Sequence, residues 1–392
     1  MKLLLTRKDI EPNIENNEGK TSLHLAASKG NSECIKLLLT NEDIDVNVQS
    51  QGKYNKGFTP LHEALENGHH ECVKVLLQSK DINVQIKDDN GRTPLHVGIE
   101  FHHHACVESL LSVLAIDVNA QDNDGSTPLQ YAVRYNDTYC LKLLLQHEDI
   151  NLNLQGEDGC TALHFACVYG PVECLNLLLN ETDTDVNARL SWGDTVLHLA
   201  ARFGITESIK RLLSDRRINV NAQDNDGYTP YYTAAKNGYK ECMDLIAQHK
   251  DFDISIKPTD GFIDVHLAAS IGDIDKLKSL PEAVSVDINV KDKNGSTPLA
   301  YAAQNGKIEA VRFLLTQKDI DVNARGADGM TPLHFAVLGG HLECVKLLLS
   351  HPNININIKD DNNQTSLAIA DSSSNPNKQA IIDLLKQHGA TE

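Results

Sequence analysis

Apolar residues recur along the chain in pairs of short runs separated by glycine, and each pair has the spacing of two helices. Residues 321–349 show the unit clearly, as DVNARGADGMTPLHFAVLGGHLECVKLLL. Asp-Gly predicts a turn, Thr331 is a favourable helix N-cap, and Pro332 suits the first helical position. A second helix is predicted over 341–350. Helices of about eight to ten residues are unstable alone, so their apolar sides must pack against neighbouring copies.

The unit repeats through almost the whole chain. The residue that begins the Thr-Pro-Leu-His motif recurs after one step of 38 residues and then nine steps of 34. Ile263 occupies this position in the eighth copy, where Thr is missing. The eleven copies, called repeats one to eleven below, hold this residue at Thr21, Thr59, Thr93, Thr127, Thr161, Thr195, Thr229, Ile263, Thr297, Thr331 and Thr365. A period held over this length indicates a repeat architecture.

The motif Thr-Pro-Leu-His, with Ala two residues later, then Gly and a Val-Lys-Leu-Leu-Leu helix, resembles the ankyrin repeat. The resemblance covers essentially all 392 residues. It implies an all-α repeat solenoid with short β-hairpin fingers, in which antiparallel helix pairs stack side by side. It also implies that partners contact the finger tips and the solvent end of the first helix of each repeat.

Departures from the repeat divide the chain into four segments. Residues 1–20 resemble half a repeat, because Leu-Leu-Leu near the start aligns with the second helix of later copies. Repeats one to seven occupy 21–258, a degenerate repeat eight occupies 259–292, and repeats nine to eleven with a C-terminal cap occupy 293–392. The sequence does not decide whether the array continues in a longer protein.

Repeat eight departs most from the pattern. Ile263 and Asp264 replace the capping Thr and the Pro, Lys276 stands where other copies prefer Cys, and Pro281 interrupts the second helix. Loss of an N-cap alone costs about 1 kcal/mol. We therefore expect the second helix to stop at Pro281 and the array to be weakest, with a bend, near residues 258–285.

Composition and charge narrow the class of partner. With 36 basic and 54 acidic residues, the formal net charge is −18. Such a chain repels phosphate, which argues against nucleic acid as a partner. No apolar run approaches the ~18 residues of a membrane span, and the start of the chain is too short for a signal peptide. We expect no membrane insertion, a monomer, and a cytoplasmic location. A nuclear location, or a secreted effector acting inside a host cell, stays open.

Repeated polar residues are predicted to serve the repeat itself. One column in the second helix holds seven of the nine cysteines, which we expect to be buried, reduced packing residues: Cys34, Cys72, Cys106, Cys140, Cys174, Cys242 and Cys344. The resemblance implies that the histidines of the Thr-Pro-Leu-His motif bond the turns locally. The finger asparagines suit residues that bond their own turn backbone: Asn13, Asn47, Asn119, Asn153, Asn187, Asn221, Asn289, Asn323 and Asn357.

One histidine cluster stands outside these columns. His102-His103-His104 follows the first helix of repeat three, His69 and His70 precede it in stacked register, and Asp137 follows His103 one repeat later. Imidazoles from neighbouring loops are suitable transition-metal ligands. Nothing in the spacing fixes a tetrahedral set, so we expect no metal at His69, His70, His103 or His104.

No catalytic motif is present: the chain has no phosphate-binding glycine loop, nucleophile elbow, metalloprotease helix or kinase signature. The repeats also leave no room for a catalytic domain. We expect no catalytic residue, no cofactor and no resident metal, and hence a protein that is not an enzyme.

The candidate binding residues are those that the repeat does not require. The position eight residues after the motif Thr, at the solvent end of the first helix, is aromatic in four successive copies: Phe101, Tyr135, Tyr169 and Phe203. Arg134, Arg202, Trp192 and Tyr228 accompany them. Aromatic residues and Arg dominate binding hot spots. The alternative is that the aromatics pack laterally on one another and seal the end of the helix.

We therefore predict a non-catalytic scaffold that binds one or more partner proteins or peptides. Stacking of the repeats holds the binding surface in place before association, which lowers the entropic cost. Two alternatives stay open. The chain is the targeting or substrate-recruiting arm of a larger enzyme or channel, or it is an ankyrin-type inhibitor of an enzyme.

Overall fold

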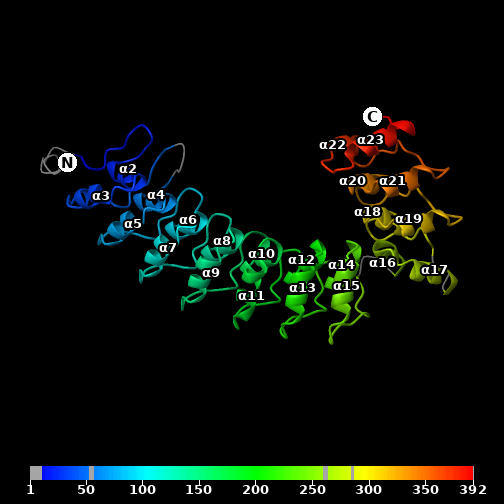
Figure 1. The fold of residues 1–392 in the computed structure, drawn as a ribbon, viewed down its shortest axis with the longest axis horizontal. Coiled ribbons are helices and arrows are strands. Elements are labelled where there is room, and N and C mark those ends of the chain that lie inside the picture. The colour runs from blue at the N-terminus through cyan, green and yellow to red at the C-terminus, as the bar shows by residue number, and fades with distance from the viewer. Residues whose placement is uncertain (1–10, 53–56, 259–263, 284–286, 392) are drawn as a thin grey trace. The chain divides into compact units, whose positions relative to one another are not determined.

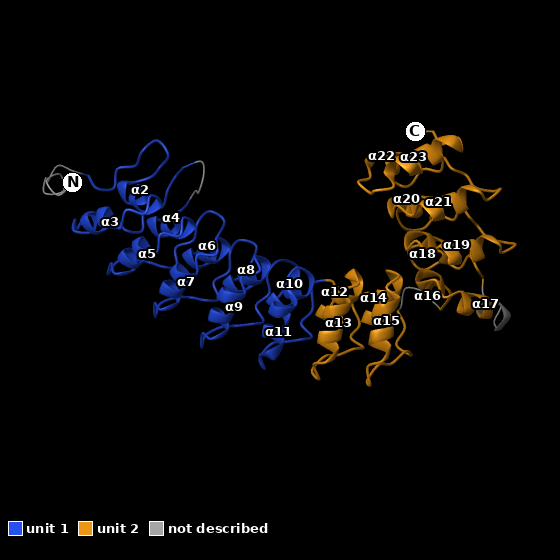
Figure 2. Cartoon of the chain, viewed as in Figure 1, with its two compact units in different colours: residues 1–191 blue, residues 192–392 orange. Residues whose placement is uncertain are grey.

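A computed structural model describes residues 11–52, 57–258, 264–283 and 287–391, with the side chains of 280–283 excepted. These residues form two compact units, 1–191 and 192–392, each of which is described by itself (Figure 2). Ile263 and the start of the predicted half repeat, residues 1–10, lie outside the described residues. The four-segment division of the sequence stays a prediction.

Every repeat contributes two helices that follow one another closely in sequence (Figure 1). In the first unit they are α2 (Ser22–Ser28), α3 (Ser32–Leu38), α4 (Pro60–Glu66), α5 (His70–Leu77), α6 (Pro94–Glu100), α7 (His104–Leu111), α8 (Pro128–Arg134), α9 (Thr138–Leu145), α10 (Ala162–Val168) and α11 (Val172–Asn180). In the second unit they are α12 (Val196–Phe203), α13 (Thr206–Leu213), α14 (Pro230–Lys236), α15 (Lys240–Ala247), α16 (Asp264–Ile271), α17 (Ile274–Ala283), α18 (Pro298–Gln304), α19 (Ile308–Leu315), α20 (Pro332–Leu338), α21 (Leu342–Leu349), α22 (Ser366–Ser372) and α23 (Lys378–Gln387). The 3₁₀ turns η1 (Glu157–Gly159) and η2 (Ala327–Gly329) lie in two fingers.

The predicted solenoid is confirmed, but its fingers are turns rather than strands. None of the described residues belongs to a β-strand. Several fingers close through a short backbone bond instead, as when Asp122 N–H donates to Ser126 O (2.9 Å) and Asp292 N–H donates to Ser296 O (3.1 Å). The carboxylate of the same Asp also accepts N–H groups of its own turn, so these fingers need no strand ladder.

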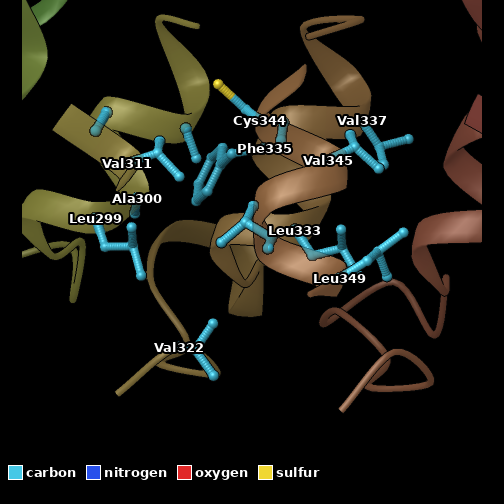
Figure 3. Close-up of a cluster of buried hydrophobic side chains, with 14 of the residues drawn as sticks. Leu299, Ala300, Val311, Val322, Leu333, Phe335, Val337, Cys344, Val345 and Leu349 are labelled. Atoms are coloured by element: carbon cyan, nitrogen blue, oxygen red, sulfur yellow. The ribbon is translucent and has the colours of Figure 1, made fainter. Parts of the chain in front are cut away.

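The core is a layer of apolar side chains between neighbouring helix pairs. Within each unit the first helices of successive repeats pack on one another. Figure 3 shows this in the second unit, where Leu299, Val311, Leu333, Phe335 and Val345 converge from α18, α19, α20 and α21. Six of the seven column cysteines are buried as predicted, whereas Cys34 is only half-buried.

The motif histidines join neighbouring repeats as well as their own turn. The N–H of Thr93 donates to Nδ1 of His96 (3.1 Å), and Nε2 of His96 lies 3.0 Å from the carbonyl of Ser126 in the next repeat. An N–H can only donate and a carbonyl can only accept, so the geometry requires a neutral ring with its proton on Nε2. The expectation of local bonding was therefore incomplete.

Repeat four makes the same pair of bonds without a histidine. Gln130 accepts from Thr127 N–H through Oε1 (2.7 Å) and donates from Nε2 to the carbonyl of Cys160 (2.7 Å). A side-chain amide therefore reproduces both contacts of the neutral imidazole.

The finger asparagines also differ from the prediction, because they bond the following repeat rather than their own turn. Asn119 donates from Nδ2 to the carbonyl of Asp149 (2.7 Å) and accepts from the N–H of Asn151 (2.8 Å). The same two bonds occur at Asn153 and Asn221. An amide offers a donor and an acceptor at a fixed spacing, so each Asn connects two successive loops.

Repeat eight is irregular in a way that the sequence anticipates only in part. Its second helix does not stop at Pro281, since α17 continues to Ala283. Pro281 lies in the last turn, where its missing N–H removes only one helical bond. In the described residues α16 packs on both α14 and α18, whereas α17 has no comparable packing against α15 (Figure 1).

Repeats seven and nine touch each other directly across this irregular repeat. Lys307 donates from Nζ to the carbonyl of Gly238 (2.8 Å), and Asn305 donates from Nδ2 to the carbonyl of Lys236 (3.0 Å) and to that of Ser270 (3.1 Å). Among the described residues of the other repeats, the hydrogen bonds between repeats join immediate neighbours, as when Nε2 of His341 lies 2.9 Å from the carbonyl of Gln304.

Candidate partner-binding surface

Three of the predicted aromatic residues lie at the ends of helices that pack side by side in the first unit. Phe101, Tyr135 and Tyr169 are the C-cap residues directly after α6, α8 and α10. Phe101 is 41% exposed and Tyr169 is 68% exposed, whereas Tyr135 is half-buried. Since α8 packs on both α6 and α10, the three residues share one edge of the unit.

Tyr135 is held by a polar network from the preceding repeat. Its hydroxyl donates to Glu100 Oε1 (3.1 Å), and Glu100 Oε2 pairs with Arg92 (2.5 Å). Burial and the negative charge of Glu100 raise the pKa of Tyr135. The ring also meets His102 edge-on, with centroids 6.5 Å apart. Tyr135 is thus fixed in place and offers only part of its ring to solvent.

Arg134 precedes this tyrosine and lies over a ring of the following repeat. Its guanidinium carbon is 4.8 Å from the centroid of Phe165, a cation–π geometry worth about 0.5–1 kcal/mol at an exposed site. The side chain is nevertheless exposed, so its donors remain accessible. Arg134 is thus a cation held in a defined position over Phe165.

In the second unit, one buried carboxylate positions two of the predicted residues. Asp194 accepts from the indole N–H of Trp192 (3.1 Å) and from Nε and an Nη of Arg202 (3.0 and 2.6 Å). Trp192 is 44% exposed and Phe203, the last residue of α12, is 52% exposed. Trp192, Arg202 and Phe203 form a second group of exposed or partly exposed side chains, which belongs to the second unit.

Tyr228 differs from the other predicted residues because it is buried, with 3% exposure. Lys236 covers it, with Nζ 4.2 Å from the ring centroid and 3.0 Å from the hydroxyl. Tyr228 therefore has almost no ring surface left for a partner. The expectation that it forms part of an exposed surface needs correction, since the neighbouring helix supplies a lysine that the finger sequence does not reveal.

The histidine cluster assembles differently from the register considered in the sequence. His69 and His103 each reach back to a backbone carbonyl of the preceding repeat, and His70 lies 2.9 Å from Ser109 Oγ. By contrast, His102 and His104 both approach the carboxylate of Asp137. Sequence spacing missed this grouping because it depends on the left-handed backbone at His102, with φ of 58°.

Two exposed tyrosines, absent from the predicted set, lie at the starts of second helices. Tyr139 is 43% exposed in α9, and its hydroxyl donates to Glu108. Tyr239 is 40% exposed before α15 and lies against Gly204.

Among the described helices, none has both the length and the apolar character needed to cross a bilayer.

The repeat pattern and the fold agree with the comparisons with known proteins. The family model described as ankyrin repeats in three copies matches residues 1–88, 43–122, 114–190, 182–258, 265–360 and 319–391. None of the curated proteins matches the chain.

Several solved structures are similar to the chain. The ankyrin repeat domain of Bcl-3, described as a unique member of the IkappaB protein family, is 22% identical with a TM-score of 0.53, and the match covers 59% of this chain and 100% of that one. The ankyrin repeat domain of human ASB11 is 27% identical with a TM-score of 0.47, covering 60% of this chain and 100% of that one. EF0377, an ankyrin repeat protein, is 27% identical with a TM-score of 0.46, covering 48% and 97%.

The Bcl-3 likeness is a likeness of fold alone. The family matches, by contrast, extend from residue 1 to residue 391 with a short gap at 259–264, and the structure has two helices in every repeat. The chain belongs to the ankyrin-repeat family.

Proposed function

We propose that the chain binds a partner protein through the aromatic edge of its first unit, defined as Phe101, Arg134, Tyr135 and Tyr169. Ankyrin repeats generally mediate protein–protein interactions. The observation that carries the proposal is the exposure of Phe101 and Tyr169 at positions where other repeats hold Lys29, Asn67 or Gly339. Large exposed apolar groups beside a positioned Arg are typical of binding hot spots.

The contacts of these residues favour this function over lateral packing. Tyr135 contacts the rings of Tyr131 in its own repeat and His102 in the preceding one, and Tyr169 contacts the ring of Phe165 in its own repeat. Among the described residues, no ring contact joins Phe101, Tyr135 and Tyr169 to one another. Rings that sealed the helix ends would be buried against each other. A row of separated rings instead offers several spaced anchors to an extended or helical protein segment.

The exposed group in the second unit supports a second contact of the same kind. Trp192 and Arg202 share the buried carboxylate of Asp194, so both are oriented before any partner arrives. Pre-ordered side chains lose less entropy on association. We propose that this group engages a further part of the same partner or a second protein.

The ankyrin-repeat fold is typically a non-catalytic binding module. We propose that the chain has no reaction of its own and acts in a reducing compartment such as the cytoplasm, which suits its nine free thiols. An arm of a larger enzyme and an enzyme inhibitor use the same surface, and they differ in what happens to the partner's activity.

Site-specific crosslinking tests the proposal. A photoreactive phenylalanine analogue at Tyr169 should crosslink a partner protein in cells, whereas the same analogue at Leu114, a fully exposed residue after α7, should not. Replacing Phe101 and Tyr169 by Ala should then weaken the purified complex by a few kcal/mol. Equal crosslinking at both positions, or an unchanged affinity of the double variant, would contradict the proposal. Adding the chain to an assay of the partner distinguishes an inhibitor from a scaffold.

A further inference from the structure

Two imidazoles and one carboxylate converge where repeats three and four meet in the first unit. His102 follows the first helix of repeat three, His104 is the first residue of α7, and Asp137 is the N-cap of α9. The side chain of Asp137 is 1% exposed, whereas those of His102 and His104 are 48% and 44% exposed. The three groups thus form a site with a buried carboxylate at its base and two rings at its rim.

The distances suit a small metal ion. Nδ1 of His102 and Nε2 of His104 each lie 3.1 Å from Oδ2 of Asp137, and the three ligand atoms lie within 4.8 Å of one another. Ligands at about 2.0–2.1 Å from a tetrahedral Zn²⁺ lie roughly 3.3 Å apart. Both nitrogen–oxygen separations are therefore close to the value that coordination needs.

Two of the three ligands, Asp137 and His104, are each held by a further contact. Oδ1 of Asp137 accepts from the N–H of Cys140 (2.9 Å), which leaves Oδ2 to face the rings. The ring of His104 stacks on Tyr139, with centroids 4.6 Å apart. Burial alone would raise the pKa of Asp137, but the bonds from Cys140 and His102 lower it overall, so the group is a carboxylate at neutral pH.

We propose that His102, His104 and Asp137 form a binding site for a divalent transition metal of the zinc class. His102 coordinates through Nδ1, His104 through Nε2 and Asp137 through Oδ2, with water at the open position. Borderline nitrogen and oxygen ligands favour Zn²⁺, Co²⁺ or Ni²⁺ over Ca²⁺ or Mg²⁺. The proposed site replaces the expectation of no metal at His104, which it joins to His102 and Asp137, and it leaves out His69, His70 and His103.

A bound ion would connect repeats three and four beside the aromatic edge. His102 meets the ring of Tyr135 edge-on and directly follows Phe101. Because the ion joins α7 to α9 through three side chains, it would stabilise this part of the first unit and reduce the freedom of the residues that the partner is proposed to contact. The site itself does not depend on that partner.

The chain supplies matched replacements for each ligand from equivalent positions. Asn136 has the left-handed backbone of His102 one repeat later, with φ of 56°, so His102→Asn keeps the turn. Thr138 begins α9 as His104 begins α7, so His104→Thr keeps the helix start. Asn31 caps α3 by accepting from Cys34 N–H (3.0 Å), so Asp137→Asn keeps the cap.

The test is titration of the full chain, free of any affinity tag and kept reduced, with Zn²⁺ by calorimetry and with Co²⁺ by absorbance. One ion should bind per chain, and each of the three variants should weaken binding at least tenfold. The control His70→Thr, at the position of His104 one repeat earlier, should bind within twofold of the wild type. Circular dichroism shows that each variant retains its helices.

Several results would overturn the site. These are no stoichiometric binding below about 100 µM free Zn²⁺, unchanged binding in all three variants, or an equal loss in His70→Thr. A sulfur-to-cobalt charge-transfer band would also overturn it, because the ion would then be held by cysteine. Visible d–d bands without that band, lost in the ligand variants, would support nitrogen and oxygen coordination.

Discussion

Replacing His62 and His96 by glutamine should make repeats two and three much less sensitive to acid. Both rings are fully buried. Each accepts the N–H of its motif Thr through Nδ1, and each approaches a carbonyl of the next repeat through Nε2, at 3.2 Å for His62 and 3.0 Å for His96. A protonated Nδ1 would be a hydrogen-bond donor facing the donor N–H of the Thr, and the bond between them would be lost. The folded state therefore requires the neutral ring.

The pKa values give the size of the effect. Burial lowers the pKa of both rings from 6.5 to about 4. The carbonyl bonds and the nearby carboxylates of Asp88 and Asp122 act in the opposite direction, while Arg92 lowers both values further. Burial is the dominant cause of the lowered pKa values, so the two rings have them only in the folded state.

The direction in which the free energy of unfolding changes with pH follows from proton uptake on unfolding. Between pH 6.5 and 4 the unfolded chain binds a proton at each ring that the folded chain does not, so the free energy of unfolding falls as the pH falls. Above pH 6.5 the two states do not differ at these rings. The slope is about 1.4 kcal/mol per pH unit per ring, which gives a loss of about 2 kcal/mol per ring at pH 5 and about 4 kcal/mol for both.

Glutamine is the right replacement because Gln130 already makes both bonds in repeat four. Hydrogen exchange of the full chain at pH 7.5 and pH 5, corrected for intrinsic rates, measures the opening free energy of each repeat. In the wild type, repeats two and three should lose protection at pH 5, and in His62→Gln/His96→Gln most of that loss should vanish. His147→Gln, outside the motif column, serves as control. An equal acid loss in the double variant and the wild type would refute the reasoning.

Four further results are expected. Tyr169→Ala should change the free energy of unfolding by less than about 0.5 kcal/mol in urea titrations, because the ring is largely exposed, and a larger loss would show that it packs. Cys344→Ser should destabilise by about 1–3 kcal/mol, since it buries a hydroxyl in a cluster of apolar side chains; a neutral effect would argue against a packing role. Asn119→Ala should cost about 1–3 kcal/mol and raise exchange in the loops of repeats three and four together, whereas a change confined to one loop would contradict the inter-repeat bonds. Lys307→Ala should raise exchange in repeat seven as well as repeat nine, and protection of repeat seven at the wild-type level would show that the contact carries no coupling.

Much of the fold was predictable because the same residues recur at the same positions in many copies of the repeat. The helix pairs, their starts at the motif Thr and the buried cysteine column all follow from side chains that act within one repeat. The direction of the Asn bonds was not predictable, because a turn amide can bond its own loop or the next one, and only the stacking distance decides. The end of α17 was misjudged because Pro281 falls in its last turn.

The candidate site was predictable to a smaller degree. Sequence reasoning located Phe101 and Tyr169 because nothing in the repeat requires a large side chain there. It could not foresee the burial of Tyr228 under Lys236, nor the meeting of His102, His104 and Asp137. Both depend on where a side chain of a different helix points, which periodicity does not encode.

The contacts from Asn305 and Lys307 to repeat seven change how unfolding should spread through the second unit. In a linear array each repeat contacts only its two immediate neighbours. A single repeat of low stability then allows the repeats on its two sides to unfold independently of each other. Here repeat nine holds repeat seven as well as repeat eight, so the three repeats form a closed set of mutual contacts. A statistical description of this unit would need a second-neighbour term. Damage within repeat eight would then be shared by both flanking repeats, and the sequence-degenerate segment would melt as part of a three-repeat block.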